Sequence, residues 1–361
     1  MTDNSPTETD DLINDNPKML IIGPSWVGDM VMAQALFVLL KQQKPNREID
    51  VIAPAWTRPL LERMPEIRGS LDMPIGHGKF MWSERKKIGR GLRGQYQECI
   101  VLPNSWKSAL IPFFANIPKR IGWRGEMRFG LLNDIRLLNK RRYPLMVQRY
   151  VALGLPNAAL LPDPLPLPKL VAHDVLIPKL LEHFELNLDK PVLALCPGAE
   201  FGPAKQWPES HYSAVAQTKI SEGWQVWIMG SEKDRAVAEK IKGFLPQDMQ
   251  ASAHVLAGAT SLAEAIDLLS RADAVVANDS GLMHIAAALQ KPLVAVYGST
   301  SPEFTPPLGE RVRTESIPVD CGPCFKRECP KGHLKCLQEL QPQQVLKSLH
   351  AVSQHVVEIE G

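Results

Sequence analysis

The sequence predicts an α/β protein with two doubly wound, Rossmann-like domains that face each other across a cleft. Three observations lead to this prediction. Short apolar runs alternate with amphipathic stretches of helical period along the chain, a pattern typical of parallel sheets covered by helices on both faces. A proline-rich segment, 155–170, interrupts this alternation once. The length of 361 residues suits two domains of ordinary size better than one.

The first half of the chain is expected to form one domain, at residues 17–154. Apolar runs with β-branched residues predict its strands, and stretches in which apolar residues recur every three or four positions predict its helices. The expected strands are 19–22, 49–53 and 99–102. The expected helices are 30–42, 57–64, 83–92 and 105–114.

The linker is expected at 155–170, because five prolines there rule out a continuous helix or a central strand. The alternation then restarts in a second domain, 171–341, and a closing helix within 342–361 completes the fold. The expected strands of this domain are 192–196, 225–229, 254–256, 274–277 and 293–297. Its expected helices are 210–222, 233–244, 262–270 and 282–289.

The N-terminal segment, 1–16, is expected to be a disordered tail. It carries five acidic residues and lacks the basic start and apolar core of a signal peptide. No apolar run in the sequence approaches the roughly 18 residues that a membrane-spanning helix needs. Six cysteines without an export signal favour reduced thiols. We therefore expect a cytoplasmic protein.

The net charge of +2 hides an uneven distribution. Residues 18–149 hold 23 Lys and Arg against 10 Asp and Glu, whereas residues 150–361 hold 18 against 24. So large a positive excess predicts an anionic partner for the first domain, such as a nucleic acid, a phosphorylated ligand or an anionic membrane surface. Basic helix faces that are merely solvated are the alternative.

Loops that follow predicted strands form the candidate site, because open α/β domains bind ligands beyond the carboxyl ends of their strands. The first such loop, 23–29, ends in Gly28-Asp29 directly before a helix. It lacks the Gly-x-Gly-x-x-Gly fingerprint of dinucleotide-binding domains, which disfavours a nicotinamide dehydrogenase. Asp29 either caps the helix or projects a carboxylate into the cleft, where it could act as a general base.

Two loops of the second domain carry further charged candidates. The loop 196–208 contains two glycines and three prolines and presents Lys205, a point charge suited to neutralising a phosphate leaving group. Glu232 follows the strand 225–229. Its carboxylate could bind ribose or base hydroxyls, or could cap the next helix.

The sharpest motif is Asn278-Asp279-Ser280-Gly281, at the end of the predicted strand 274–277. Its small residues open a helix N-terminus, whose free N–H groups and positive dipole end suit a pyrophosphate. His284, one turn further on, is expected to be a buried, hydrogen-bonded histidine rather than a catalyst.

These motifs, in this order and spacing, resemble the ADP-heptose:lipopolysaccharide heptosyltransferases of glycosyltransferase family 9. The likeness covers nearly everything after residue 16. It implies a GT-B fold and, without a catalytic metal, inverting transfer of L-glycero-D-manno-heptose from ADP-heptose to the inner core of lipopolysaccharide. It points to an acceptor that already carries one heptose (heptosyl-Kdo2-lipid A); a family member that acts on Kdo itself is the alternative.

Carried over by position, the resemblance implies that Asp29 is the general base and that Lys205 is a catalytic partner of the pyrophosphate. The implied donor contacts are Glu232, Asn278, Asp279, Ser280 and Gly281. The implied acceptor is anionic and lipid-linked, so the basic first domain would hold the protein at the inner face of the inner membrane. The candidate acceptor contacts are Arg58, Arg63, Arg120 and Arg124. No cofactor, nucleic acid or stable protein partner is expected.

A cysteine cluster lies outside this scheme. It comprises Cys321, Cys324, Cys329 and Cys336, with His333 among them. Four thiolates, or three with the histidine, could form a zinc site, but the second pair lacks the Cys-x-x-Cys spacing of a zinc ribbon. We expect reduced thiols and leave zinc open. A zinc-containing nucleic-acid-binding protein is the remote alternative, disfavoured because the sequence shows no recognised binding module.

Overall fold

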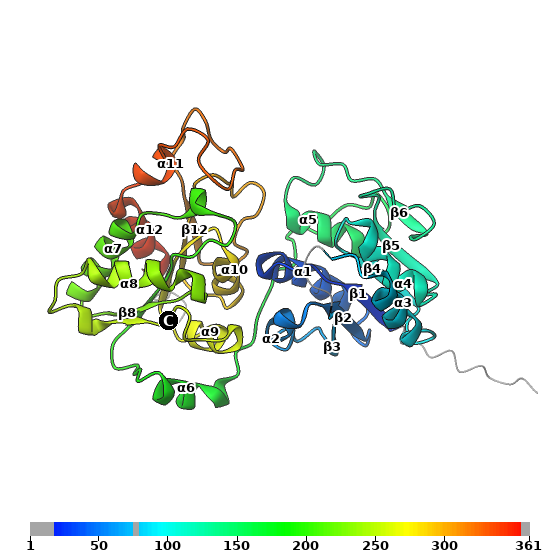
Figure 1. The fold of residues 1–361 in the computed structure, drawn as a ribbon, viewed down its shortest axis with the longest axis horizontal. Helices are drawn as coiled ribbons and strands as arrows, with labels where there is room; N and C mark the ends of the chain where they lie inside the picture. Colours follow the sequence, from blue (N-terminus) through cyan, green and yellow to red (C-terminus); the bar gives the residue numbers. More distant parts are fainter. Residues whose placement is uncertain (1–17, 75–78, 355–361) are drawn as a thin grey trace, which may run out of the picture.

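The computed structural model describes residues 18–74 and 79–354, which form two lobes, each built on a parallel six-stranded sheet (Figure 1). In spatial order the first sheet contains β3 (Gly69–Asp72), β2 (Ile49–Ala53), β1 (Met19–Ile22), β4 (Glu98–Val101), β5 (Lys119–Trp123) and β6 (Asp134–Arg136). The second sheet contains β12 (Val312–Glu315), β11 (Leu293–Val296), β10 (Ala274–Asn278), β7 (Val192–Cys196), β8 (Gln225–Ile228) and β9 (Ala253–Val255). The strand order turns back at the middle of each sheet, which confirms two doubly wound domains.

Helices pack on the faces of both sheets. The N-terminal lobe has α1 (Val27–Gln43), α2 (Arg58–Leu61), α3 (Trp82–Gly91), α4 (Leu110–Phe114) and α5 (Met146–Val151). The C-terminal lobe has α6 (Ile177–His183), α7 (Glu209–Ser221), α8 (Arg235–Gly243), α9 (Leu262–Leu269), α10 (Gly281–Ala288), α11 (Lys335–Gln338) and α12 (Pro342–Gln354). Within residues 18–74 and 79–354, every helix falls short of the length and apolar content that a bilayer-spanning segment requires.

Several of the connections between these elements contain a short 3-10 helix. They are η1 (Ala55–Thr57), η2 (Trp106–Ala109), η3 (Ala152–Gly154), η4 (Asp174–Leu176), η5 (Pro203–Lys205), η6 (Glu232–Asp234) and η7 (Gln250–Ser252). Between η3 and η4 the described chain contains no helix or strand, and the predicted proline-rich linker lies within this stretch. The predicted tail, 1–16, lies outside the described residues.

The expected strands in the middle of the sheets are present, with bounds that differ by one residue at most. β1, β2 and β7 agree residue for residue, and all their residues are buried. The structure adds four strands that were not expected: β3, β5, β6 and β12. The closing helix α12 starts at residue 342, the first residue of the segment in which it was expected.

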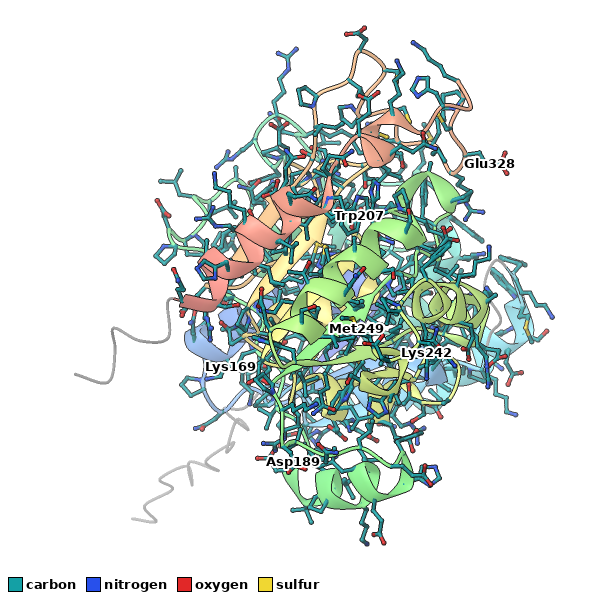
Figure 2. The ribbon with its side chains drawn as sticks, turned by 90° about the vertical axis from the view of Figure 1, so that its left-hand side faces the viewer. Lys169, Asp189, Trp207, Lys242, Met249 and Glu328 are labelled. Carbon is teal, nitrogen blue, oxygen red and sulfur yellow. The ribbon has the colours of Figure 1, made fainter. Side chains whose placement is uncertain are left out.

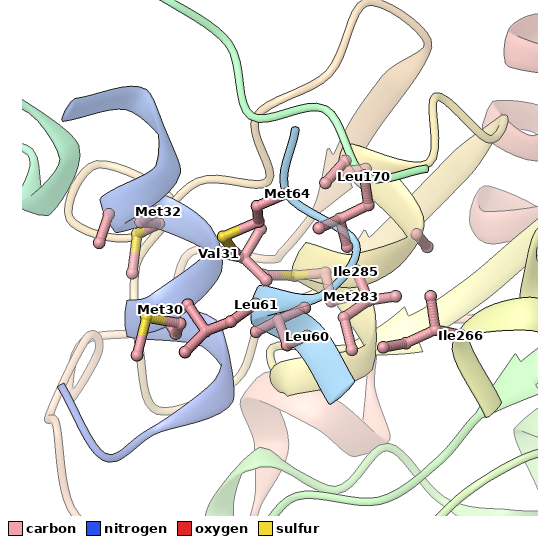
Figure 3. Packing of buried hydrophobic residues seen from close by; sticks show 14 of the residues in the cluster. Met30, Val31, Met32, Leu60, Leu61, Met64, Leu170, Ile266, Met283 and Ile285 are labelled. Atoms are coloured by element: carbon pink, nitrogen blue, oxygen red, sulfur yellow. The ribbon is translucent and has the colours of Figure 1, made fainter. Parts of the chain in front are cut away.

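The two lobes share an apolar interface. Met30 and Val31 from α1 and Leu60 from α2 belong to the same buried cluster as Met283 and Ile285 from α10. Figure 3 shows these side chains converging from both lobes. The lobes are therefore joined by a hydrophobic core and not only by the chain between them.

One buried ion pair crosses this interface. Arg63, just after α2, donates from Nε and Nη2 to the two carboxylate oxygens of Asp267 on α9, at 2.9 and 2.5 Å. Both side chains are 1% exposed. The backbone N–H of His173 also donates to Asp267, at 3.0 Å. The pair thus fastens both lobes and the segment before η4 at one point.

Buried aromatic residues pack together in the core of the C-terminal lobe. Trp207, labelled in Figure 2, is 1% exposed and packs against Tyr212 on α7, with ring centroids 5.0 Å apart. Its Nε1 donates to the carbonyl of Leu340, next to α12, at 2.9 Å. Trp207 therefore fixes the end of the loop that carries Lys205.

Candidate active site

The first turns of α1 and α10 lie against each other where the two lobes meet. A Cβ atom at Gly28 would come within 2.7 Å of the His284 ring, and one at Gly281 within 3.0 Å of Val27. Only glycine allows this approach at position 28 without displacing the histidine. Burial lowers the pKa of His284 to about 4, so the ring is neutral at physiological pH. This agrees with the expectation of a buried histidine.

Asp29 lies in the first turn of α1, and the N-cap position belongs to Trp26. Asp29 is therefore not the N-cap residue. The hydroxyl of Tyr150, on α5, donates to Asp29 Oδ1 at 3.3 Å. Burial is the main influence and raises the pKa of the Asp29 carboxyl, while the Tyr150 hydrogen bond and the charge of Lys205 act in the opposite direction. A carboxylate with a raised pKa is a stronger base than an ordinary aspartate.

Lys205 approaches the same point from the C-terminal lobe. Its Nζ lies 2.5 Å from Asp279 Oδ2 and 5.0 Å from the centroid of the Phe201 ring. Thr300 Oγ1 donates to the same carboxylate oxygen at 2.7 Å. Asp279 is 5% exposed, so it holds Lys205 in place from within the lobe, and the Lys205 side chain, 13% exposed, is the more accessible of the two.

Three cavities converge on this point. The interdomain cavity, about 660 Å³, is lined by both lobes, with Trp26 and Trp56 on one side and Ser231 and Asp234 on the other. The junction cavity, about 450 Å³, is lined by residues that include Asp29, Lys205, Asp279, His284 and Thr300. The N-lobe cavity, about 350 Å³, extends from Asp29 to Lys79, Arg85, Lys107 and Arg149. Asp29 lines both the junction cavity and the N-lobe cavity and marks their boundary.

The predicted donor residues fall into two groups. Ser280 and Gly281 line both the interdomain and the junction cavity, and Asp279 lines the latter. Asn278 is fully buried and lies behind them. Its Oδ1 accepts from the Tyr212 hydroxyl at 2.9 Å, and its Nδ2 donates to the carbonyl of Pro197 at 2.5 Å. Asn278 thus holds the loop in place, and it is not among the residues that line the three cavities.

Glu232, another predicted donor contact, does not line these cavities. Its side chain is 74% exposed and lies 4.0 Å from Arg235. The interdomain cavity is bordered instead by Ser231 and Asp234 of the same turn. Asp234 Oδ2 accepts from the backbone N–H of Ser231 at 2.8 Å and from its hydroxyl at 2.7 Å. The Ser-x-x-Asp spacing, a capping-box pattern, is the sequence signal that could have pointed to Asp234.

None of the four predicted acceptor arginines lines any of the three cavities in the described part of the chain. Arg63 is buried in its pair with Asp267, and Arg58 pairs with Asp72 on the surface. Arg120 donates to the carbonyls of Leu131 and Ile117. Arg124 is exposed in the turn after β5. Their locations depend on tertiary contacts that sequence position does not reveal.

Other basic residues line the N-lobe cavity, and the sequence did not identify them as site residues. They are Lys79, Arg85, Lys107 and Arg149. Burial lowers the pKa of Arg85 and of Arg149, but an arginine remains charged at neutral pH. Arg149 also lies 4.8 Å from the Phe304 ring of the other lobe. The positive charge predicted for the first domain is thus present next to Asp29.

The four cysteines do not line these cavities, although Phe325, the chain neighbour of Cys324, lines the junction cavity. Cys321 Sγ lies 3.8 Å from His333 Nε2. Among the residues that the structure describes, no group of three or more His, Cys, Asp or Glu side chains is arranged to hold a metal ion.

The chain matches known proteins over most of its length. The model of glycosyltransferase family 9 (heptosyltransferase) matches residues 85–335. The lipopolysaccharide heptosyltransferase 2 of Salmonella typhimurium is 49% identical over 341 residues, which cover 93% of this chain and 98% of that protein. The lipooligosaccharide heptosyltransferase 2 of Haemophilus ducreyi is 49% identical over 344 residues, 92% of this chain and 98% of that protein.

Solved structures agree with these matches. The structure of the Escherichia coli ADP-heptose lipopolysaccharide heptosyltransferase II superposes with a TM-score of 0.85 at 46% identity, covering 94% of this chain and 99% of the other. A second E. coli heptosyltransferase, solved with ADP, gives a TM-score of 0.67 at 19% identity over 93% and 99% of the chains, which supports the GT-B fold. The chain therefore belongs to glycosyltransferase family 9, the heptosyltransferases.

Proposed function

We propose that this protein transfers L-glycero-D-manno-heptose from ADP-heptose to the first heptose of the lipopolysaccharide inner core, heptosyl-Kdo2-lipid A. The observation that carries the proposal is the position of Asp29. This carboxylate belongs to the N-terminal lobe, has a raised pKa and lines a cavity together with Lys205 of the other lobe. A base on one side and a cation on the other is the arrangement that an inverting transfer from a diphosphate donor needs.

The donor fits the C-terminal side of the cleft. Ser280 is the N-cap of α10, and its side chain makes no capping hydrogen bond to a described residue. The first N–H groups of the helix are thus available to the diphosphate. Lys205 would balance the charge that develops on the leaving ADP. Ser231 and Asp234, on the interdomain cavity, are suited to hydroxyl groups of the nucleotide or the heptose.

The acceptor fits the N-lobe cavity. Its basic residues Lys79, Arg85, Lys107 and Arg149 match an anionic, phosphate-bearing saccharide. An acceptor hydroxyl beside Asp29 would lose its proton to the carboxylate as its oxygen bonds to C1 of the heptose. The bond from C1 to the ADP oxygen breaks on the opposite face, which inverts the anomeric centre.

The acceptor can be tested with purified enzyme, ADP-heptose and three inner-core acceptors that carry zero, one or two heptoses. We expect ADP release and heptose incorporation with the one-heptose acceptor. Turnover with the zero-heptose acceptor alone would indicate a transferase that acts on Kdo. ADP-heptose turnover with none of the three would overturn the proposal.

A further inference from the structure

The N-terminal lobe carries a surface cluster of five aromatic rings. The Phe80 ring lies 5.9 Å from both Trp82 and Trp106, measured between ring centroids. Trp82 lies 5.1 Å from Phe114, which in turn lies 5.5 Å from Phe113. Phe80 lies just before α3 and Trp82 is its first residue, while the other rings come from η2 and from the end of α4. Helices α3 and α4 lie side by side at the edge of the lobe (Figure 1).

Part of this aromatic cluster is exposed. Phe80 is 48% exposed, Trp82 41% and Phe113 38%. The loop after β5 adds Met127 and Phe129, which are more exposed still. Glu126 in this loop accepts a hydrogen bond from the backbone N–H of Trp106 at 2.8 Å, so the loop lies beside the rings. Together these residues form an apolar patch of a kind that marks an interaction surface.

Helix α3, whose first residue is the cluster ring Trp82, is rich in basic residues. Helix α3 contains four basic residues and one acidic residue. Lys87 and Arg90 on this helix are exposed, as are Lys79 before it and Arg93 after it. At the other end of the cluster, the Arg120 guanidinium lies 6.0 Å from the centroid of the Phe113 ring. We refer to the five rings with Lys79, Lys87, Arg90 and Arg93 as the aromatic-basic face.

Arg85 connects this face to the N-lobe cavity. It lines the cavity, and its guanidinium donates to the carbonyls of Lys79, Phe80 and Lys107 at 3.3, 2.7 and 3.2 Å. Lys79 and Lys107, the direct chain neighbours of two cluster rings, line the same cavity. The aromatic-basic face and the mouth of the cavity are therefore held together as one rigid unit.

We propose that the aromatic-basic face docks on an anionic lipid bilayer. Tryptophan and phenylalanine favour the boundary between headgroups and acyl chains, and exposed lysine and arginine add attraction to anionic headgroups. A protein partner fits less well, because lysine is depleted from protein interfaces. Docking brings the N-lobe cavity to the level of the headgroups, where the sugar of a lipid-anchored acceptor lies. This last consequence rests on the proposed function; the docking itself does not.

Vesicle co-sedimentation of the full chain tests the proposal. We expect wild-type protein to bind vesicles of phosphatidylethanolamine and phosphatidylglycerol in a salt-dependent way, and to bind pure phosphatidylcholine vesicles at least about tenfold more weakly. The exchange Lys87→Glu with Arg90→Glu should abolish the preference for anionic vesicles. The matched control, Lys179→Glu with Lys190→Glu, makes the same charge change at exposed positions of the other lobe and should reduce binding much less.

The rings are tested with Phe80→Ser combined with Trp82→Ser. We expect a loss of vesicle binding of about tenfold or more, with Phe244→Ser, an exposed ring of the C-terminal lobe, as the control that retains binding. The ring variant should still transfer heptose to a soluble, delipidated acceptor at the wild-type rate. A wild-type protein that transfers to neither kind of acceptor would refute the proposed function without affecting the binding result.

Three results would overturn the docking proposal. The first is a wild-type protein that shows no preference for anionic vesicles. The second is a charge variant, Lys87→Glu with Arg90→Glu, that binds anionic vesicles as well as the wild type does. The third is concentration-dependent self-association of the wild type without vesicle binding, lost in the ring variant, which would make the face an interface between two copies of the chain.

Discussion

Two charged pairs near the boundary of the lobes differ in what surrounds them. Arg63 and Asp267 join the lobes, and each side chain is 1% exposed. Lys205 and Asp279 belong to one lobe and border a cavity that Asp29 lines from the other. A sealed pair can serve only the stability of the interface, whereas a pair beside a cavity can act on a ligand. The surroundings of a charge, and not its residue type, therefore indicate its role.

Removing one partner of the sealed pair should have the largest effect. Arg63→Ala leaves Asp267 buried without its partner, and we expect the free energy of unfolding to fall by about 3 to 5 kcal/mol. Chemical denaturation measures this loss. Arg58→Ala, which breaks the exposed pair with Asp72, is the control and should leave the midpoint nearly unchanged. A midpoint for Arg63→Ala as high as that of the control would mean that the interface does not depend on the pair.

Removing Lys205 from the pair beside the cavity should lower the catalytic rate. Lys205→Ala removes the cation that would balance the leaving ADP, and we expect kcat to fall on the order of 10² to 10³. Lys219→Ala, at an ion-paired lysine that lines none of the three cavities, should keep wild-type kcat. Steady-state kinetics with ADP-heptose gives both values. Unchanged kinetics in Lys205→Ala would make Lys205 a structural residue.

A smaller effect is expected at Tyr150. Its hydrogen bond lowers the pKa of Asp29 against the larger effect of burial. Tyr150→Phe should therefore raise that pKa, and because the base must be deprotonated, the acid limb of the kcat–pH profile should move to higher pH. Tyr143→Phe, at another buried tyrosine of the lobe, should leave the profile in place. If the kcat–pH profile of Tyr150→Phe were identical to that of the wild type, the Tyr150 hydrogen bond would not influence the pKa of the catalytic base.

The smallest expected effect is on the free energy of unfolding, which the buried charge of Asp29 lowers at neutral pH. Its pKa is raised in the folded state, so its contribution to stability is full below the unfolded pKa and is lost as the pH rises through the folded pKa. Asp29→Asn removes the buried charge. We expect the variant to be more stable than the wild type at neutral pH and the difference to disappear in acid. Thermal unfolding at several pH values measures it, and a less stable variant at neutral pH would contradict this cost.

The sequence predicted the inner strands, the edge strand β9 and the loops after them, and it missed four other strands nearer the edges. β1 and β7 are apolar and buried at every residue, which leaves a clear pattern. β3 and β12 lie at the sheet edges, with polar residues that are half-buried or exposed. Strands of this kind lack the apolar run or alternation that identifies a strand.

The candidate site divides in the same way. Asp29 lies in the first turn of the helix that follows β1, and Ser280 is the N-cap of the helix that follows β10, so their meeting at the cleft could be predicted from the topology rule for α/β domains. Arg85 lies in a helix among other basic residues. Only the tertiary packing places its side chain at the N-lobe cavity and the side chain of Arg63 in the interface between the lobes. Charge alone does not distinguish these two arginines.

The most direct measurement compares Asp29→Asn with the wild type in donor binding and in turnover. The substitution keeps the shape of the side chain and an acceptor for Tyr150 but removes the base. We predict that the variant binds ADP-heptose with a Kd close to that of the wild type and that its kcat falls by roughly 10² to 10⁴. A kcat near the wild-type value would contradict the assignment of Asp29 as the general base.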